Sequence, residues 1–180
     1  MTYNIKAIET MYKNTLFRSR LEARWAAFFD LCGWEWSYEP ADFNGWFPDF
    51  CLFCESEGER EVYVEVKPVS IAPLDVFDKI DKSDCSTEVL VVGMRNPFTP
   101  KYWDACAIGW LREDGIGWDE AIYRSGYGYG SDGIGFCHTT GSFRNRITGH
   151  HDGDDFSTID RATIKGLWSR AGNLVQWKKG

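Results

Sequence analysis

The sequence lacks the segments that mark membrane and secreted proteins. It has no run of about 18 apolar residues, the length that a membrane-spanning helix needs, so we expect no membrane partner. Residues 1–20 contain no apolar core of the secretory type, which predicts a cytoplasmic location. The 6 cysteines are then expected to be reduced thiols.

Proline and two well-known catalytic motifs are scarce or missing as well. Only 6 residues are proline and 43% are hydrophobic, which excludes a wholly disordered chain. No phosphate-binding P-loop and no Gly-x-Ser-x-Gly elbow occurs, so nucleotide hydrolysis and serine esterase chemistry have no support. A chain of 180 residues is long enough for one domain, or for one domain with a small appendage.

Aromatic and acidic residues are plentiful instead. Phe, Trp and Tyr make up 16% of the chain, which favours a core or contact surfaces built from rings. The net charge is -7, with the acidic excess in the middle of the sequence and basic residues at both ends. Acidic clusters can hold a divalent metal, and DNA contacts need only local basic strips, so the net charge excludes neither function.

Hydrophobic spacing in the first half of the chain predicts an α-β-β-β-α-β order. The expected elements are a helix over 18–32, strands over 34–38, 46–54 and 62–67, a helix over 73–82 and a strand over 88–93. Ser19 or Thr15 is suited to cap the first helix, and Gly33 is suited to end it. We therefore expect an α/β fold with a mixed central sheet.

The second half of the chain is patterned less clearly. Its candidate strands are 105–111, 118–124 and 133–138, with a glycine-rich loop over 127–135 and an irregular polar segment over 143–155. Helical spacing of apolar residues from Arg161 to Trp177, with Trp168, Leu174 and Val175 in the stripe, predicts a final helix. We expect a core over 1–95 and an irregular extension over 96–180, whose terminal helix packs on that core.

Four charged side chains form the candidate site. Glu65 and Lys67 alternate onto one face of the strand over 62–67. A short turn should pair this strand antiparallel with the preceding one, which brings Asp49 close to Glu65. Glu22 lies at the margin of the apolar stripe of the first helix, where a carboxylate needs a partner such as Lys67 or a metal ion.

Carboxylates gathered in this way suit a hard divalent cation. Two bare carboxylates repel each other, and a cation between them removes that penalty. Oxygen ligands with room for water favour Mg²⁺, for which Mn²⁺ is the natural substitute. The sequence therefore predicts a magnesium or manganese site.

The same residues resemble a nuclease signature. Pro48-Asp49, a spacer of 15 residues and then Glu65-Val66-Lys67 is similar to the motif of the PD-(D/E)XK nuclease superfamily. The expected order of elements resembles the restriction-endonuclease-like core of that superfamily. A closer resemblance is to small phage-encoded nucleases and to the end-cleaving endonuclease subunit of Tn7-like transposons. The segments that carry it are 19–25, 38–40, 47–50 and 64–67.

The resemblance implies metal-dependent hydrolysis of DNA by a nuclease of a phage or other mobile element, acting in the cytoplasm of the host cell. Asp49, Glu65 and the Val66 carbonyl would hold Mg²⁺ or Mn²⁺. Glu22 would complete the metal shell or bind a second ion. Lys67 would orient or activate the attacking water and stabilise charge on the phosphate.

DNA is the partner that this function implies. The residues expected to contact it are Arg18, Arg20, Arg144, Arg146, Lys165 and Arg170. A single active site cuts one strand at a time, so a double-strand break would require a homodimer or a protein partner.

The site residues also allow simpler interpretations. Glu65 and Lys67 would then form an exposed pair on an edge strand, and Asp49 would cap a turn. Glu22 would form a salt bridge with Arg18 or Arg24, and Glu39 is expected to be structural or an outer partner of the site. The alternative function is a non-cleaving binding protein on the same scaffold, which recognises DNA or inhibits a host defence protein.

Two other groups contain metal-binding residue types. Cys51 and Cys54 form a C-x-x-C motif, but positions i and i+3 of a strand point to opposite faces, which disfavours a zinc knuckle. The run over 150–155 holds two histidines and three aspartates, a composition that is more often a solvated loop than a site. We expect neither group to carry the activity.

Overall fold

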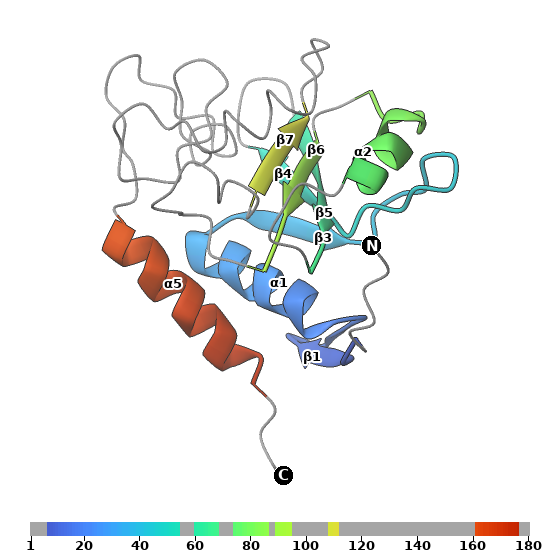
Figure 1. The fold of residues 1–180 in the computed structure, drawn as a ribbon. Coiled ribbons are helices and arrows are strands. Elements are labelled where there is room, and N and C mark those ends of the chain that lie inside the picture. The colour runs from blue at the N-terminus through green and yellow to red at the C-terminus, as the bar shows by residue number, and fades with distance from the viewer. Residues whose placement is uncertain are drawn as a thin grey trace, which may run out of the picture.

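The computed structural model describes residues 7–54, 60–68, 74–86, 89–94, 108–111 and 161–176 (Figure 1). Within these ranges the elements are β1 (Thr10–Tyr12), β2 (Thr15–Phe17), α1 (Arg20–Cys32), β3 (Glu35–Tyr38), β4 (Phe50–Cys54), β5 (Arg60–Val66), α2 (Leu74–Asp81), β6 (Val89–Val92), β7 (Ile108–Leu111) and α5 (Arg161–Leu174). The chain is thus a mixed α/β protein. The succession α1-β3-β4-β5-α2-β6 confirms the order expected from the sequence.

A mixed sheet with the strand order β3-β4-β5-β6-β7 forms the centre of the molecule. β3, β4 and β5 are antiparallel neighbours, β6 runs parallel to β5, and β7 runs antiparallel to β6. The connection between the two parallel strands contains α2, as a parallel crossover requires. All four residues of β6 are buried, which explains why its sequence is continuously apolar.

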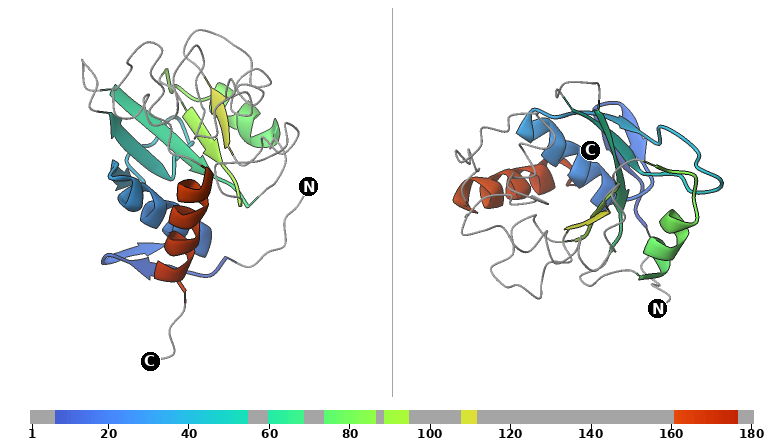
Figure 2. Two further views of the ribbon diagram at one scale, coloured as in Figure 1. Left: turned by 90° about the vertical axis from the view of Figure 1, so that its left-hand side faces the viewer. Right: turned by 90° about the horizontal axis from the view of Figure 1, so that it is seen from above.

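Helices cover both faces of this sheet (Figure 1, Figure 2). One face packs on α1 and α5, and its buried strand residues are Phe50, Leu52, Val62, Val64, Val66, Leu90 and Val92. The other face packs on α2, and its buried strand residues are Cys51, Tyr63, Val89 and Val91. The strict alternation along β5 confirms that its three valines face one side, away from Tyr63.

Local capping explains where α1 begins and ends. The Ser19 side chain accepts a hydrogen bond from the Glu22 backbone N–H at 3.1 Å, so Ser19 is the N-cap and the helix begins at Arg20 rather than at residue 18. Gly33 ends the helix with a φ of 75°, a conformation that glycine adopts without strain. Both capping residues were expected from the sequence.

One tryptophan holds α5 against α1. The Trp168 ring centroid lies 4.6 Å from that of Trp25, and the Arg24 guanidinium lies 3.9 Å from the centre of the Trp168 ring. Arg24 also donates a hydrogen bond to the Trp168 carbonyl at 2.9 Å. The terminal helix therefore packs on α1. Of the residues predicted in its apolar stripe, Trp168 and Val175 are buried, whereas Leu174 was wrongly included because it is 52% exposed.

A short hairpin before α1 was not predicted. β1 and β2 pair antiparallel, and the two residues between them, Lys13 and Asn14, have φ values of 44° and 65°. Positive φ at both positions is the geometry of a tight hairpin turn. Each strand has three residues, which is too short for alternating hydrophobicity to give a clear signal.

The start of β4 also differs from the expectation. β4 begins at Phe50 and not at residue 46, because Asn44 and Gly45 turn the chain with φ values of 50° and 88°. Trp46 then bridges back to Phe43. Trp46 and Phe47 are apolar and extend the pattern of the strand, but Pro48 has no backbone N–H to pair with a neighbouring strand.

The remaining expectations concern the second half of the chain. β7 covers residues 108–111 of the strand expected over 105–111. The strands expected over 118–124 and 133–138, the loop over 127–135 and the polar segment over 143–155 lie outside the described residues. Among the helices in the described ranges, none has the length and apolar character that a membrane span requires.

Candidate active site

Buried acidic side chains gather around the end of β5. The register of β4 and β5 pairs Phe50 with Val64, which places Asp49 opposite Glu65 as the sequence predicted. Asp49 is 4% exposed, Glu65 is 5% exposed, and Glu22 on α1 is 8% exposed. Buried carboxylates require partners, so the contacts of each one determine what the site can do.

Glu65 is held by one cation and one indole. Its Oε1 forms an ion pair with Lys67 Nζ, and its Oε2 accepts a hydrogen bond of 3.0 Å from Trp46 Nε1. Trp46 is fully buried beneath the turn that precedes β4. This partner was not predicted, because Trp46 was assigned to a strand and nothing in the local pattern points to Glu65.

Asp49 is held by the backbone of β5 and by Arg18. Its Oδ2 accepts a hydrogen bond of 2.6 Å from the Val66 N–H, and its Oδ1 pairs with Arg18 Nη2 at 2.6 Å. Burial and the nearby charge of Glu65 raise the pKa of Asp49 to about 7, although Lys67 and the Val66 N–H oppose the shift. Asp49 can therefore hold a proton near neutral pH when no metal is bound.

Glu22 is held by the first turn of α1 and by β3. The Ser19 hydroxyl donates to its Oε1 at 2.7 Å, and the Tyr38 hydroxyl donates to its Oε2 at 2.6 Å. Burial and the contact with Glu22 raise the pKa of Tyr38 to about 12, so Tyr38 remains a donor. The protein partners of Glu22 are thus Ser19, Tyr38 and, at 3.9 Å, Arg18, rather than Lys67.

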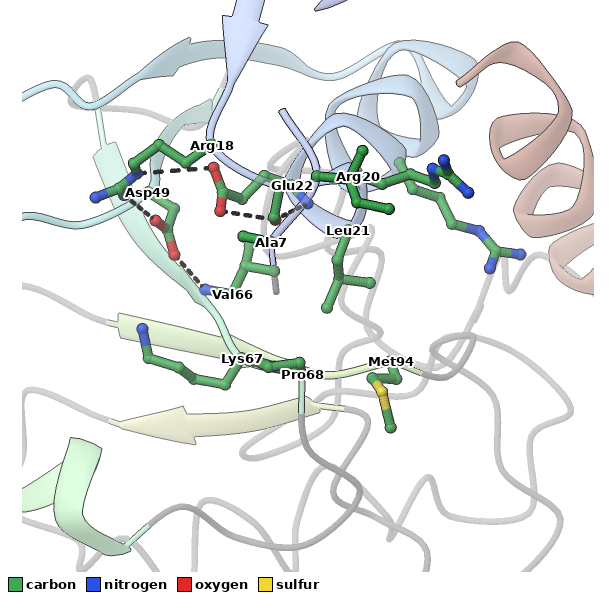
Figure 3. Close-up of a pocket in the computed structure, with 13 residues that line it drawn as sticks. Ala7, Arg18, Arg20, Leu21, Glu22, Asp49, Val66, Lys67, Pro68 and Met94 are labelled. Atoms are coloured by element: carbon green, nitrogen blue, oxygen red, sulfur yellow. Dashed lines mark hydrogen bonds and ion pairs between the residues drawn. The ribbon is translucent and has the colours of Figure 1, made fainter. Parts of the chain in front are cut away.

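Arg18 lies among the carboxylates. Its Nε is 3.0 Å from Glu39 Oε1 and 3.9 Å from Glu22 Oε2, in addition to the contact of its Nη2 with Asp49. Figure 3 shows its side chain between Asp49 and Glu22. Arg18 was expected to contact DNA, and Glu39 was expected to be structural or an outer partner of the site. In the structure both belong to the polar network of the site.

Lys67 follows β5 and pairs with the carboxylate two residues before it. Burial alone would lower the pKa of Lys67, but the charges of Glu65 and Asp49 raise it overall. Lys67 therefore carries its positive charge at neutral pH. The carboxylates hold it in place as an electrostatic group, and its backbone N–H donates to the Val92 carbonyl at 2.8 Å.

The acidic network adjoins a pocket of about 620 Å³ (Figure 3), which Glu22, Asp49 and Lys67 line and which Glu65, among the described residues, does not. Its charged and polar lining residues are Arg18, Ser19, Arg20, Glu22, Arg24, Asp49 and Lys67. Its apolar lining residues are Ala7, Ile8, Leu21, Val66, Pro68 and Met94. The pocket thus combines charged and apolar side chains. A small ion alone would not need the apolar ones.

The structure brings together only part of the expected DNA-binding set. Arg18 and Arg20 line the pocket. Lys165 and Arg170 are exposed on α5 and are not among the described lining residues. Arg144 and Arg146, like the acidic and histidine-containing run over 150–155, lie outside the described residues.

The two cysteines of the C-x-x-C motif, Cys51 and Cys54, both lie in β4.

The donor set fits a hard divalent cation in its chemistry. Four carboxylates face two cations in this network, which leaves two excess negative charges when Asp49 is ionised. Carboxylate oxygens are the ligands that Mg²⁺ and Mn²⁺ prefer. In the described part of the chain, no three His, Cys, Asp or Glu side chains already stand in a metal-binding arrangement. Side-chain contacts would therefore have to rearrange for a metal to bind.

Comparison with known proteins gives no relative for this chain. No family model, no curated protein and no solved structure matches it. The resemblance to PD-(D/E)XK nucleases stays a prediction that rests on the residues themselves.

Proposed function

We propose that the chain is a metal-dependent deoxyribonuclease with a restriction-endonuclease-like core, of the kind that phages and other mobile elements encode. One observation carries this proposal: three buried carboxylates, those of Glu22, Asp49 and Glu65, gather at the end of β5 and share two cationic partners, Arg18 and Lys67. Uncompensated buried charge costs several kcal/mol and is retained where a function needs it. A divalent cation would supply the missing positive charge.

Each residue of the network has a role in this proposal. Asp49, Glu65 and the Val66 carbonyl would hold Mg²⁺ or Mn²⁺, and Glu22 would complete the shell or hold a second ion. When bound, the ion lowers the pKa of water and neutralises charge on the phosphodiester. Trp46 would keep Glu65 in one orientation through its indole hydrogen bond.

Lys67 would act through its charge. Its pKa is raised by Glu65 and Asp49, so it is a poor proton acceptor at neutral pH. A compact ammonium group on a flexible stem suits the task of orienting the attacking water and stabilising the charge that develops on the phosphate.

DNA is the proposed substrate because arginine side chains border the acidic floor. Arg20 and Arg24 line the same pocket as Asp49 and Lys67. Guanidinium groups beside a metal site are suited to backbone phosphates. Cutting both strands of a duplex would require a second copy of the chain or another protein.

Cleavage of supercoiled plasmid and of linear single-stranded DNA tests the proposal. Wild type is expected to cut at pH 8 with Mg²⁺ or Mn²⁺ and not with EDTA. Glu65→Gln and Lys67→Ala are each expected to lower the rate by about 100-fold or more, since a charged group at the reacting phosphate is worth this much. Glu61→Gln is the matched control, because Glu61 is exposed on the same strand and lies outside the pocket.

A non-cleaving binding protein is the second candidate, and one observation favours it. Both oxygens of Asp49, of Glu65 and of Glu22 already have protein partners. A network closed in this way can serve binding or stability without a metal. This candidate is expected to bind DNA or a protein without cutting, and Glu65→Gln would then alter stability alone.

A further inference from the structure

Arg18 differs from the other basic residues of the pocket in what it contacts. Arg24 is engaged by Trp168, and Lys67 pairs with Glu65. Arg18 alone among the described basic residues of the pocket reaches Asp49, at 2.6 Å from Oδ1. The same guanidinium lies 3.0 Å from Glu39 Oε1, so it links Asp49 to a carboxylate that is not among the described lining residues of the pocket.

The two oxygens of Asp49 differ in how firmly they are held. Oδ2 accepts a hydrogen bond from the backbone N–H of Val66, and that bond cannot be given up without moving the strand end or turning the carboxylate. Oδ1 is held by a side chain. A cation that bound Asp49 with the strand in place would therefore compete with Arg18 for Oδ1.

The Arg18 side chain can move away from Asp49 while it stays paired with Glu39. Its side chain is 57% exposed, whereas that of Asp49 is 5% exposed. Glu39 pairs with Nε of Arg18 and is itself 43% exposed, so this contact lies toward solvent.

We infer that Arg18 is the resident cation of the acidic site, which neutralises Asp49 when no metal is present and which a divalent ion displaces from Oδ1. This inference rests on the proposed function, because it takes Asp49 as a metal ligand. Arg18 is then a positioning residue that sets the metal affinity of the site. Its presence keeps the buried carboxylates paired in the metal-free protein, at the cost of weaker metal binding.

Mn²⁺ binding, measured by calorimetry and by the electron paramagnetic resonance signal of free Mn²⁺, tests the inference without any substrate. At pH 8 we expect Arg18→Gln to bind Mn²⁺ about tenfold more tightly than wild type, equivalent to about 1.4 kcal/mol. Lys13→Gln is the matched control, since Lys13 pairs with Asp30 at 3.0 Å outside the pocket. Its Mn²⁺ affinity is expected to equal that of wild type.

Arg18→Lys is a second variant that keeps the test valid if Arg18→Gln does not fold. It keeps the positive charge but loses the planar fork that spans Asp49 and Glu39, so its affinity should lie between those of wild type and Arg18→Gln. Circular dichroism establishes that each variant is folded before it is titrated. If wild type binds Mn²⁺ and the folded Arg18 variants bind it equally or more weakly, the inference is overturned while the proposed function stands. If neither wild type nor any folded variant binds Mn²⁺, both fail.

Discussion

Single residues in the site differ in how their charge is balanced. Glu65 pairs with Lys67 and is further fixed by Trp46. Asp49 also has a cationic partner in Arg18, yet burial and the charge of Glu65 raise its pKa to about 7. Asp49 is therefore the group of the site whose charge depends most directly on pH and on a bound cation.

The stability of the metal-free protein should fall as pH rises through this range. The ordinary pKa of an aspartate is 3.8, and that of Asp49 in the folded protein is about 7. Between these values the folded protein holds a proton that the unfolded chain has released, so the free energy of unfolding decreases with pH. We expect a loss on the order of 1–3 kcal/mol between pH 5 and pH 8, measured by urea unfolding in EDTA.

Asp49→Asn supplies the comparison, because it cannot titrate. The free energy of unfolding of this variant should decrease less with rising pH than that of wild type, because the contribution of Asp49 is missing. Mn²⁺ at pH 8 should restore stability to wild type and not to Asp49→Asn, since a bound metal stabilises the folded state alone. Equal slopes for the two proteins would show that Asp49 is charged throughout the range.

Trp46 should matter to activity as well as to stability. Trp46→Phe removes the indole N–H that donates to Glu65 and leaves a buried carboxylate oxygen without that partner. We expect the free energy of unfolding to fall by about 1–3 kcal/mol. We also expect metal-dependent cleavage to fall, because Glu65 is then free to turn.

Trp36→Phe is the control for this change. Trp36 Nε1 donates to Asp30 at 3.1 Å, so the variant loses the same type of hydrogen bond away from the pocket. Its stability should fall while its cleavage stays at the wild-type rate. A similar loss of cleavage in both variants would mean that Trp46 acts through stability only.

The sequence anticipates some of these residues and not others. Alternation along one strand is enough to place Glu65 and Lys67 on one face, and the hairpin brings Asp49 opposite to them. Trp46 reaches Glu65 from the turn before β4, and Arg18 reaches Asp49 from the segment before α1. Those contacts depend on three-dimensional geometry that periodicity does not encode.

At the scale of elements, the capping of α1 can be tested with two glycines. Gly33 has a φ of 75°, so Gly33→Ala should lower the free energy of unfolding by about 1 kcal/mol. Gly166 lies within α5, and an added methyl group there would meet nothing within 4 Å. Gly166→Ala should therefore raise stability by about 0.5–1 kcal/mol. Thermal unfolding of both variants measures these opposite signs, and a Gly33→Ala variant at least as stable as wild type would contradict the assigned cap.

Elements with strong periodicity were predicted well, and short ones were not. α1 and β5 carry long, regular patterns of apolar residues, and their existence and buried faces agree with the structure. The hairpin of β1 and β2 has three residues a strand, so its pattern is too short to read. β4 was predicted too long because the apolar residues Trp46 and Phe47 come shortly before it.

At the scale of the whole molecule, α5 joins the end of the chain to the core around α1. Trp168→Ala removes a buried ring that packs on Trp25 and Phe28, so the free energy of unfolding should fall by about 3–5 kcal/mol. Leu174→Ala on the same helix should change it by less than about 0.5 kcal/mol, because Leu174 is exposed. Chemical unfolding measures both, and equal effects would contradict the packing of α5.

The most direct measurement of the central claim is plasmid cleavage by wild type and Glu65→Gln, side by side, in Mn²⁺ and in EDTA. Cleavage by wild type in Mn²⁺, with loss on adding EDTA and a reduction of about 100-fold or more in Glu65→Gln, is the expected result. A folded wild type that leaves DNA uncut with every divalent metal, or a Glu65→Gln variant that cuts at the wild-type rate, would contradict the claim that this acidic network is a nuclease site.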